Sequence, residues 1–80
     1  MKVKLTAFGI AKDILRGTSQ VVEREDLRTI AELRAYLCQQ YPDFRRLAKL
    51  SFAVNETYQD DSFELSENDE IIILPPVSGG

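Results

Sequence analysis

The end of the chain carries its most distinctive reactive group. The last six residues read Pro75-Pro76-Val77-Ser78-Gly79-Gly80. Glycine has no Cβ, so a Gly-Gly end can pass through a narrow channel and adopt any φ. The α-carboxylate of Gly80 is ionised and unreactive at neutral pH, and a nucleophile attacks it only after activation, for instance as an acyl-adenylate. A frayed terminus is the common alternative for such an end, but the strand and the prolines before it favour a functional tail.

The other side chains offer little further chemistry. The sequence contains no His, which excludes imidazole catalysis at neutral pH and metal binding by His. The single Cys38 cannot form an internal disulfide or a thiolate metal cluster, and we expect it to pack as a small apolar residue. The glycines match no phosphate-binding loop, and the Asp60-Asp61 pair is more typical of a solvated turn than of a cation site. We therefore predict no metal, no permanently bound cofactor and no autonomous enzyme.

The length of the chain limits what it can enclose. It has 80 residues, the size of one small domain. Such a chain buries only a little more than about 60% of its unfolded surface, which leaves room for one sheet and one or two helices but hardly for a deep substrate pocket. No segment is long enough to span a membrane, and no signal peptide is recognisable. Together with the single Cys, these features predict a cytoplasmic protein.

Charge is unevenly distributed along the chain. The net charge is −3, but residues 1–50 contain ten Lys/Arg and six Asp/Glu, whereas residues 51–80 contain seven Asp/Glu and no Lys or Arg. A nucleic-acid partner is therefore disfavoured for the C-terminal part, because phosphates are bound by basic groups. A basic partner surface near the tail and a simple solvated acidic face fit this pattern equally well.

The tail follows an apolar run that is expected to be buried in a folded domain. Residues 71–74 are rich in β-branched side chains, which predicts a buried strand over 70–74. The two prolines end this strand, because proline has no N–H to donate and a fixed φ. We therefore divide the chain into a folded domain, residues 1–74, and an extended, flexible tail, residues 75–80. Fully extended, six residues reach about 20 Å, which is enough to enter the active site of another protein.

Further strands are predicted from the alternation of polar and apolar residues. They cover residues 2–7, 20–24, 51–55 and 57–59. Val3 and Leu5 share one face of the first strand, and the second strand lies close enough in sequence to pair with it as an extended hairpin. A short helical turn over 11–15 separates the two. The order of elements predicts an α+β domain, with a mixed sheet covered on one face by a helix.

The main helix is predicted from a cap and an apolar stripe. Thr29 and Glu32 fit a capping box, and Pro42 forces an end shortly before it. The stripe recurs at helical spacing and is expected to pack on the sheet: Ile30, Leu33, Leu37 and Tyr41. A short second helix is expected over 43–49, with three residues turned inward: Phe44, Leu47 and Ala48.

Two apolar residues fall out of phase with the inward positions of their strands. Phe8 follows the opposite phase to Val3 and Leu5, and Leu74 alternates with the inward residues of strand 70–74. Both are therefore expected to face away from the helix, with Tyr58 beside them. Exposed apolar groups next to a functional tail indicate an interface, although single exposed apolar residues are also normal. We predict that Phe8, Tyr58 and Leu74 bind a partner.

These features together resemble the small subunit of molybdopterin synthase, the MoaD family of ubiquitin-like β-grasp sulfur carriers. The similarity covers essentially the whole chain, and the PPVxGG ending is its most specific element. The supporting segments are Phe8-Gly9 with the turn that follows, the capped helix over 29–37, Ala53-Val54-Asn55, and Asn68-Asp69-Glu70. The resemblance implies a ubiquitin-like β-grasp fold, with a mixed sheet of about four to five strands and one main helix packed on one face.

The resemblance also implies a function and partners. A MoeB-like (E1-like) adenylyltransferase would use ATP to adenylate the Gly80 carboxylate, and a sulfur donor protein would supply the sulfur of a thiocarboxylate. The tail would insert into the large, MoaE-like subunit of a heterotetramer, where the thiocarboxylate delivers sulfur to cyclic pyranopterin monophosphate in molybdenum cofactor biosynthesis. In this scheme Gly80 carries the chemistry and Gly79 gives the tail its passage. The rest of the tail contacts the partner: Pro75, Pro76, Val77 and Ser78.

Three other interpretations remain open. The same tail fits a sulfur carrier for thiamine or another thio-cofactor, although Pro-Pro-Val favours the molybdopterin branch. A ubiquitin-like protein modifier would join Gly80 to a Lys through an isopeptide bond and would be recognised by covalent conjugates. A plain interaction domain would carry an inert tail, and deleting Gly79 and Gly80 would leave its function untouched.

Overall fold

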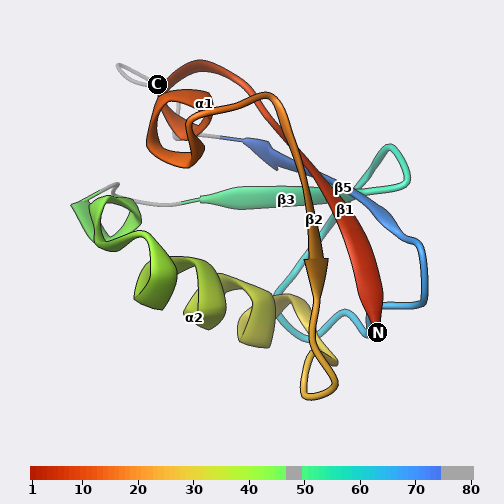
Figure 1. Ribbon diagram of the computed structural model, residues 1–80. Coiled ribbons are helices and arrows are strands. Elements are labelled where there is room, and N and C mark those ends of the chain that lie inside the picture. Colours follow the sequence, from red (N-terminus) through yellow and green to blue (C-terminus); the bar gives the residue numbers. More distant parts are fainter. Residues whose placement is uncertain (47–49, 75–80) are drawn as a thin grey trace.

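The chain folds as one sheet with a helix packed against it. The computed structural model describes residues 1–46 and 50–74. The strands are β1 (Lys2–Ala7), β2 (Ser19–Glu23), β3 (Ser51–Val54), β4 (Thr57–Gln59) and β5 (Glu70–Leu74). The helices are α1 (Gly9–Leu15), α2 (Ile30–Gln40) and the short 3-10 helix η1 (Pro42–Arg46). The five strands form one sheet in the order β2-β1-β5-β3-β4, and α2 lies across one of its faces (Figure 1). The predicted α+β architecture with a mixed sheet is confirmed.

The strand that leads to the tail lies at the centre of this sheet. β5 pairs in parallel with β1, Leu5 opposite Ile71, and antiparallel with β3, Val54 opposite Ile71. β1 and β2 pair antiparallel, as the predicted hairpin requires, and β3 and β4 do the same. Because β5 is the middle one of the five strands, the residue that precedes the tail in sequence, Leu74, belongs to the most enclosed strand of the sheet.

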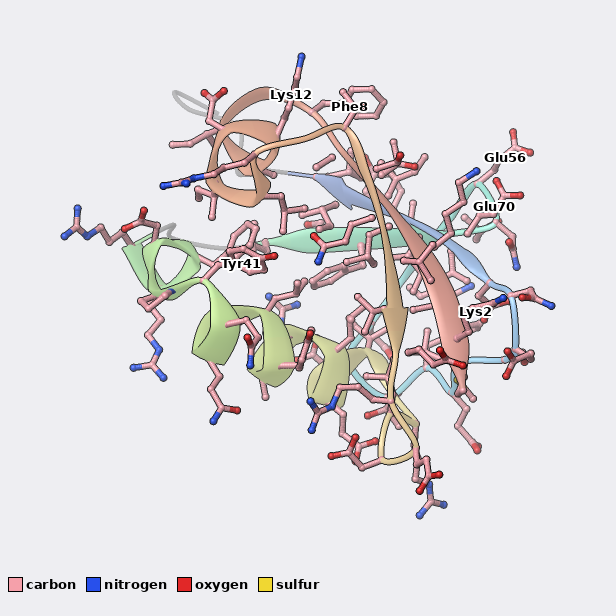
Figure 2. The ribbon with its side chains drawn as sticks, viewed as in Figure 1. Lys2, Phe8, Lys12, Tyr41, Glu56 and Glu70 are labelled. Carbon is pink, nitrogen blue, oxygen red and sulfur yellow. The ribbon has the colours of Figure 1, made fainter. Side chains whose placement is uncertain are left out.

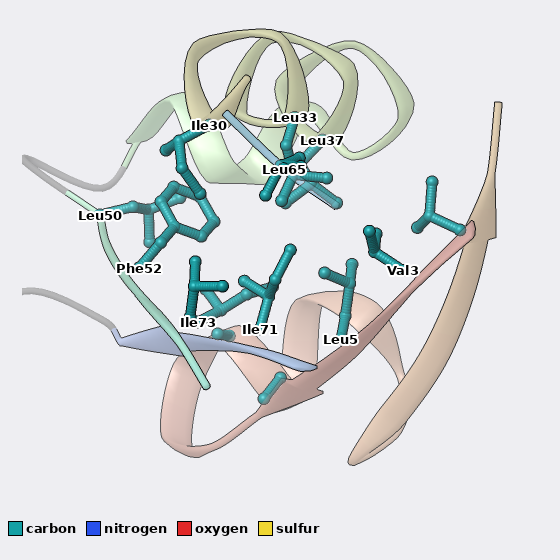
Figure 3. Close-up of a cluster of buried hydrophobic side chains, with 14 of the residues drawn as sticks. Val3, Leu5, Ile30, Leu33, Leu37, Leu50, Phe52, Leu65, Ile71 and Ile73 are labelled. Carbon is teal, nitrogen blue, oxygen red and sulfur yellow. The ribbon is translucent and has the colours of Figure 1, made fainter. Parts of the chain in front are cut away.

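The hydrophobic core fills the space between the sheet and α2 (Figure 3). Alternate residues of β1, β3 and β5 point into it, as the period of a strand requires, and β2 contributes Val22. The fully or nearly fully buried members include Val3, Leu5, Val22, Ile30, Leu33, Leu37, Phe44, Phe52, Ile71 and Ile73. The predicted stripe of α2 is thus confirmed, except that Tyr41 at its end is only half-buried and exchanges hydrogen bonds through its hydroxyl with Gln20. Cys38 is half-buried and packs against the core, as expected.

Both ends of α2 follow from local sequence. The Thr29 hydroxyl accepts a hydrogen bond from the Glu32 N–H at 3.3 Å, and the Glu32 carboxylate accepts one from the Thr29 N–H at 3.0 Å. This reciprocal pair is the predicted capping box, and a cap of this kind stabilises a helix by about 1 kcal/mol. The helix ends at Gln40, two residues before Pro42, because the residue before a proline is pushed out of helical geometry.

The two short helices differ in extent from their predictions. α1 begins at Gly9 rather than at residue 11, because Gly9 adopts a φ of 58°, which turns the chain out of β1 at little steric cost. The helix predicted over 43–49 is the 3-10 turn η1. Phe44 is buried as expected, while Leu47 and Ala48 lie outside the described residues.

Arg34 ties α2 to two other parts of the chain. Its guanidinium donates hydrogen bonds to the Leu50 carbonyl at 3.0 Å and to the Asp61 carboxylate at 2.8 Å. The guanidinium carbon also lies 5.0 Å from the centre of the Phe52 ring, within the range of a cation–π contact. Arg34 therefore stabilises the junction of α2 with β3.

Candidate functional site

The sheet has a second face, turned away from α2, whose residues are set by alternation. We call this the outer face and define it by six residues: Lys4, Thr6, Ala53, Tyr58, Ile72 and Leu74. Along β1, β3 and β5 the described neighbours of these residues are core residues, so the side chains point the other way. Tyr58 on β4 shares their face because it lies opposite Ala53. Tyr58 is 72% exposed, whereas Ile72 and Leu74 are half-buried. The outer face thus presents apolar and aromatic groups to the surface.

Strand register aligns four of these residues in one row. Ala53 on β3 lies opposite Tyr58 on β4 and opposite Ile72 on β5, and Ile72 in turn lies opposite Thr6 on β1. Directly opposed side chains on one face of a sheet are close enough to contact each other. The row therefore forms a continuous strip across four strands, with an apolar middle and an aromatic end.

Phe8 continues the outer face beyond the end of β1. Its backbone is extended, with φ −131° and ψ 161°, so it keeps the alternation of the strand and points to the side of Thr6. The ring is 53% exposed, and Figure 2 shows it projecting outward at the end of β1, away from Tyr41. The predicted outward placement of Phe8 is confirmed by the structure, while its role in binding stays a prediction.

The other two predicted contact residues are placed somewhat differently from expectation. Leu74 points outward as expected, but it is half-buried rather than fully exposed, and it lies opposite Ser51 on β3. Tyr58 shares the outer face but lies in the row of Ile72, with β3 between it and β5. Sequence reasoning missed Ile72, although the inward phase of its two neighbours already implied that it points outward.

The outer face changes from charged to apolar along the strands. Lys4 lies opposite Glu70 on one side and Val21 on the other. Figure 2 shows Lys2, Glu56 and Glu70 gathered at this charged end, with Phe8 at the opposite end. A surface hollow of about 220 Å³ opens at the charged end, lined in part by Lys2, Val21 and Glu70. The tail follows Leu74 at the apolar end, so a partner that binds the apolar end also lies next to the tail.

A buried carboxylate fastens the start of β5. Asp69 is the one charged side chain that is buried among the described residues, at 8% exposure. One of its oxygens accepts a hydrogen bond from the Asn55 amide at 3.0 Å, and the other accepts one from the Ser66 N–H at 2.7 Å. Asn55 also accepts a hydrogen bond from the Glu70 N–H at 3.1 Å. These contacts link the turn after β3 to the turn before β5.

Two carboxyl groups with a lowered pKa lie away from the outer face. A hydrogen bond from the Arg24 side chain, with the charge of that guanidinium, lowers the pKa of Asp26. Hydrogen bonds from the hydroxyl and the N–H of Ser62 lower the pKa of Asp60. Both carboxyl groups belong to exposed loops and have simple local causes, so neither indicates acid–base catalysis.

The part of the chain that the structure describes suits binding more than chemistry. Within residues 1–46 and 50–74, no three potential metal-ligand side chains come together, and no helix is long and apolar enough to cross a membrane. The residues predicted to carry the chemistry and the tail contacts all lie outside the described residues: Pro75, Pro76, Val77, Ser78, Gly79 and Gly80. The described residues that were predicted to bind a partner thus lie on or next to the outer face, whose strand β5 leads to the tail in sequence.

Comparison with known proteins places the chain in a family. The model of the family described as ThiS matches residues 5–80. The chain belongs to the ThiS family. A curated relative, the molybdopterin synthase sulfur carrier subunit of Caenorhabditis briggsae, is 32% identical over 83 aligned positions that cover 100% of this chain and 99% of the relative.

Solved structures agree with this assignment. Subunit 1 in the complex of subunits 1 and 2 of the molybdopterin-converting factor from Helicobacter pylori is 31% identical, with a TM-score of 0.67 and 100% coverage of both chains. Subunit 1 of a molybdopterin converting factor from Pyrococcus furiosus superposes with a TM-score of 0.86 at 21% identity, covering 96% of this chain and 99% of that one. The ubiquitin-like β-grasp fold implied by the sequence is confirmed.

Proposed function

We propose that this ThiS-family chain is the sulfur-carrier small subunit of molybdopterin synthase. The observation that carries the proposal is the similarity over the whole chain to curated molybdopterin synthase sulfur carrier subunits. The family match supports it, because this match runs through the Gly79-Gly80 end. Curated relatives from a nematode and from Dictyostelium discoideum, at 32% and 33% identity, carry this name. The related Helicobacter pylori chain was solved with its second subunit, which supports a large, MoaE-like subunit as the partner here.

The proposed reaction uses the Gly80 carboxylate as a carrier of sulfur. A MoeB-like adenylyltransferase joins the carboxylate to the AMP part of ATP and releases pyrophosphate. A sulfur donor protein then supplies sulfide-level sulfur, so that a C–S bond forms, the bond from carbon to the AMP oxygen breaks, and AMP leaves. In the large subunit the thiocarboxylate sulfur passes to cyclic pyranopterin monophosphate, and water restores the carboxylate. Gly79 lets the tail enter both active sites because it adds no side chain.

Docking is assigned to the apolar end of the outer face and to the tail. Phe8, Tyr58 and Leu74 keep the role expected for them, and Ile72 joins them because it lies in the same strip. Aromatic side chains such as those of Phe8 and Tyr58 are enriched in protein interfaces. Pro75, Pro76, Val77 and Ser78 would lie between this surface and the reacting Gly80, and would line the entrance to the partner. We place the complex in the cytoplasm, where the free Cys38 stays reduced.

Replacing Phe8 by Asp is expected to weaken binding of the large subunit at least tenfold without loss of stability. A buried aromatic anchor is worth about 2 kcal/mol or more in an interface, and a charge there adds the cost of desolvation. Phe8 is also the N-cap of α1 and makes no side-chain cap bond, whereas Asp is a favoured N-cap. Isothermal calorimetry and thermal melting therefore separate binding from folding.

Ala35→Asp is the matched control for this variant. It adds the same charge at an exposed position of α2, on the side of the sheet opposite the outer face. We expect its affinity for the large subunit to equal that of the unchanged chain. Equal affinities for Phe8→Asp and the unchanged chain would remove Phe8 from the interface.

The proposed function is tested by the intact mass of the chain. The protein is incubated with ATP, a MoeB-like enzyme and a sulfur donor, and we expect a species in which one carboxyl oxygen is replaced by sulfur. Adding the large subunit and cyclic pyranopterin monophosphate should return the original mass and yield molybdopterin. A mass that never changes would refute the carrier function.

The same experiment separates the other candidate functions. A thiocarboxylate that forms but is not consumed with the molybdopterin precursor indicates a carrier for thiamine or another thio-cofactor. Covalent adducts of Gly80 with Lys side chains of other proteins indicate a protein modifier. The relatives from several organisms that share the molybdopterin synthase name favour consumption of the thiocarboxylate with the molybdopterin precursor.

A further inference from the structure

The side chains of β5 define its own register poorly. The strand reads Glu70-Ile71-Ile72-Ile73-Leu74. Ile71 and Ile73 point into the core and are fully buried, while Ile72 and Leu74 point outward. A shift of the strand by one residue would put Ile72 and Leu74 inward and leave two isoleucines outward. Register is normally set by the contrast between an apolar and a polar face, and this strand has almost no such contrast beyond Glu70.

Contacts at the start of β5 supply the missing constraint. Asn55 forms two hydrogen bonds with Glu70. Its N–H donates to the Glu70 carbonyl at 2.8 Å, and its side-chain oxygen accepts from the Glu70 N–H at 3.1 Å. The Asn55 amide group also donates to the buried Asp69 carboxylate at 3.0 Å. A shift of one residue would break all three bonds and leave the Asp69 charge buried without its partner, which is strongly unfavourable.

Asn55 is suited to this place by its backbone as well as its side chain. It adopts a φ of 49°, in the left-handed region that Asn tolerates better than most residues. The Asp69 carboxylate is fixed from its other side by the Ser66 N–H at 2.7 Å, and the Asp69 carbonyl accepts from the Lys4 N–H at 2.9 Å. Asn55 and Asp69 are therefore connected to β1, to the end of β3 and to the turn before β5 at the same time.

We propose that Asn55 and Asp69 are positioning residues that fix the register of β5 and thereby the reach of Gly80. The proposal rests on the proposed carrier function, because reach matters only if Gly80 must meet reacting groups in a partner. The tail follows Leu74 directly in sequence, so a one-residue shift of β5 moves the origin of the tail by about 3.3 Å. Misplacement by even about 1 Å can cost on the order of a hundredfold in rate. Two prolines begin the tail, and their fixed φ limits how far it can absorb the shift.

The first test measures register and rate in the variant Asn55→Ala. In the described register, Phe52 lies opposite Ile73 and Val54 opposite Ile71, and these pairs should give strong Hα–Hα contacts in NMR spectra. We expect Asn55→Ala to show a second set of contacts, shifted by one residue. The kcat for adenylation of Gly80 should fall in proportion to the population of the described register, by at least about threefold, while KM for the chain changes little.

A swap of the two side chains provides a rescue. In Asn55→Asp two carboxylates face each other, and we expect register to be lost. In the double variant Asn55→Asp/Asp69→Asn, the carboxylate at position 55 still accepts from the Glu70 N–H. The new amide at position 69 donates to that carboxylate and accepts from the Ser66 N–H. All three side-chain bonds are kept, so the single register and the kcat should return.

Arg34→Met is the control for lost stability. Arg34 makes its contacts at the junction of α2 and β3, so its removal should lower the melting temperature and leave register and kcat unchanged. A single register in both Asn55→Ala and Asn55→Asp would overturn the proposal. So would a shifted register with full kcat, or an equal loss of kcat in Arg34→Met. If the unchanged chain never becomes adenylated, the carrier function fails, and the NMR contacts still decide whether Asn55 sets the register.

Discussion

Deletion of Gly80 is expected to abolish sulfur transfer, with a loss of at least about a hundredfold. The shortened chain still ends in a glycine carboxylate, but this group lies about 3.3 Å short of the place that Gly80 reaches. In the proposed reaction, the activating enzyme and the large subunit would each align the carboxyl carbon with a reacting group, and a displaced carbon would lose that alignment. Single-turnover assays with mass detection of the thiocarboxylate measure the effect.

The fold is not expected to change in this variant. All core residues of the described structure precede the tail, so thermal melting curves of the shortened and unchanged chains should coincide. Gln40→Ala, an exposed substitution at the end of α2, serves as a control that leaves the transfer rate unchanged. A shortened chain that transfers sulfur at the normal rate would contradict the requirement for Gly80, because the Gly79 carboxylate would then serve equally well.

The largest expected effect on stability is that of Phe52→Ala, a loss of about 3–5 kcal/mol in the free energy of unfolding. Phe52 is 1% exposed, lies in the core beneath α2 (Figure 3), and carries the Arg34 guanidinium over its ring. Truncation leaves a cavity and removes the partner of that cation. A domain of this size has a total stability of only about 4–12 kcal/mol, so the variant is expected to be partly unfolded at body temperature. Urea unfolding followed by circular dichroism measures the loss.

Tyr58→Ala is the matched control for this truncation. It also removes an aromatic ring from the sheet, but from an exposed position on the outer face. Surface substitutions of this kind usually change stability by less than about 0.5 kcal/mol. Losses of equal size in the two variants would contradict the assignment of Phe52 to the core and Tyr58 to the surface.

Local patterns explain why most elements were predictable from sequence. Thr29 and Glu32 lie three residues apart, and Pro42 marks the other end of the helix, so α2 followed from contacts within a few residues. The inward phase of Val3 and Leu5 followed from the period of a strand. The outward placement of Phe8 followed from the same rule, although Phe8 itself lies beyond the strand.

Contacts between distant residues could not be predicted in this way. Periodicity shows which face a residue occupies but not which strand lies beside it, so the parallel pairing of β1 with β5 and the position of Tyr58 relative to Leu74 were not readable. The bond of Asn55 to Asp69 spans 14 residues, and that of Arg34 to Asp61 spans 27. The acyl chemistry proposed for Gly80 has no catalytic side chain that would indicate it in the sequence. It was therefore inferred from the tail and from its resemblance to a family.

The parallel pairing of β1 with β5 has a mechanical consequence. A force applied at the end of β5 and directed along its axis would act on a strand that is held by β1 on one side and β3 on the other. The hydrogen bonds of both ladders run across this axis, so the force loads them together in shear instead of opening them one by one. A pull on the end of β5 would therefore be resisted by two strand ladders at once.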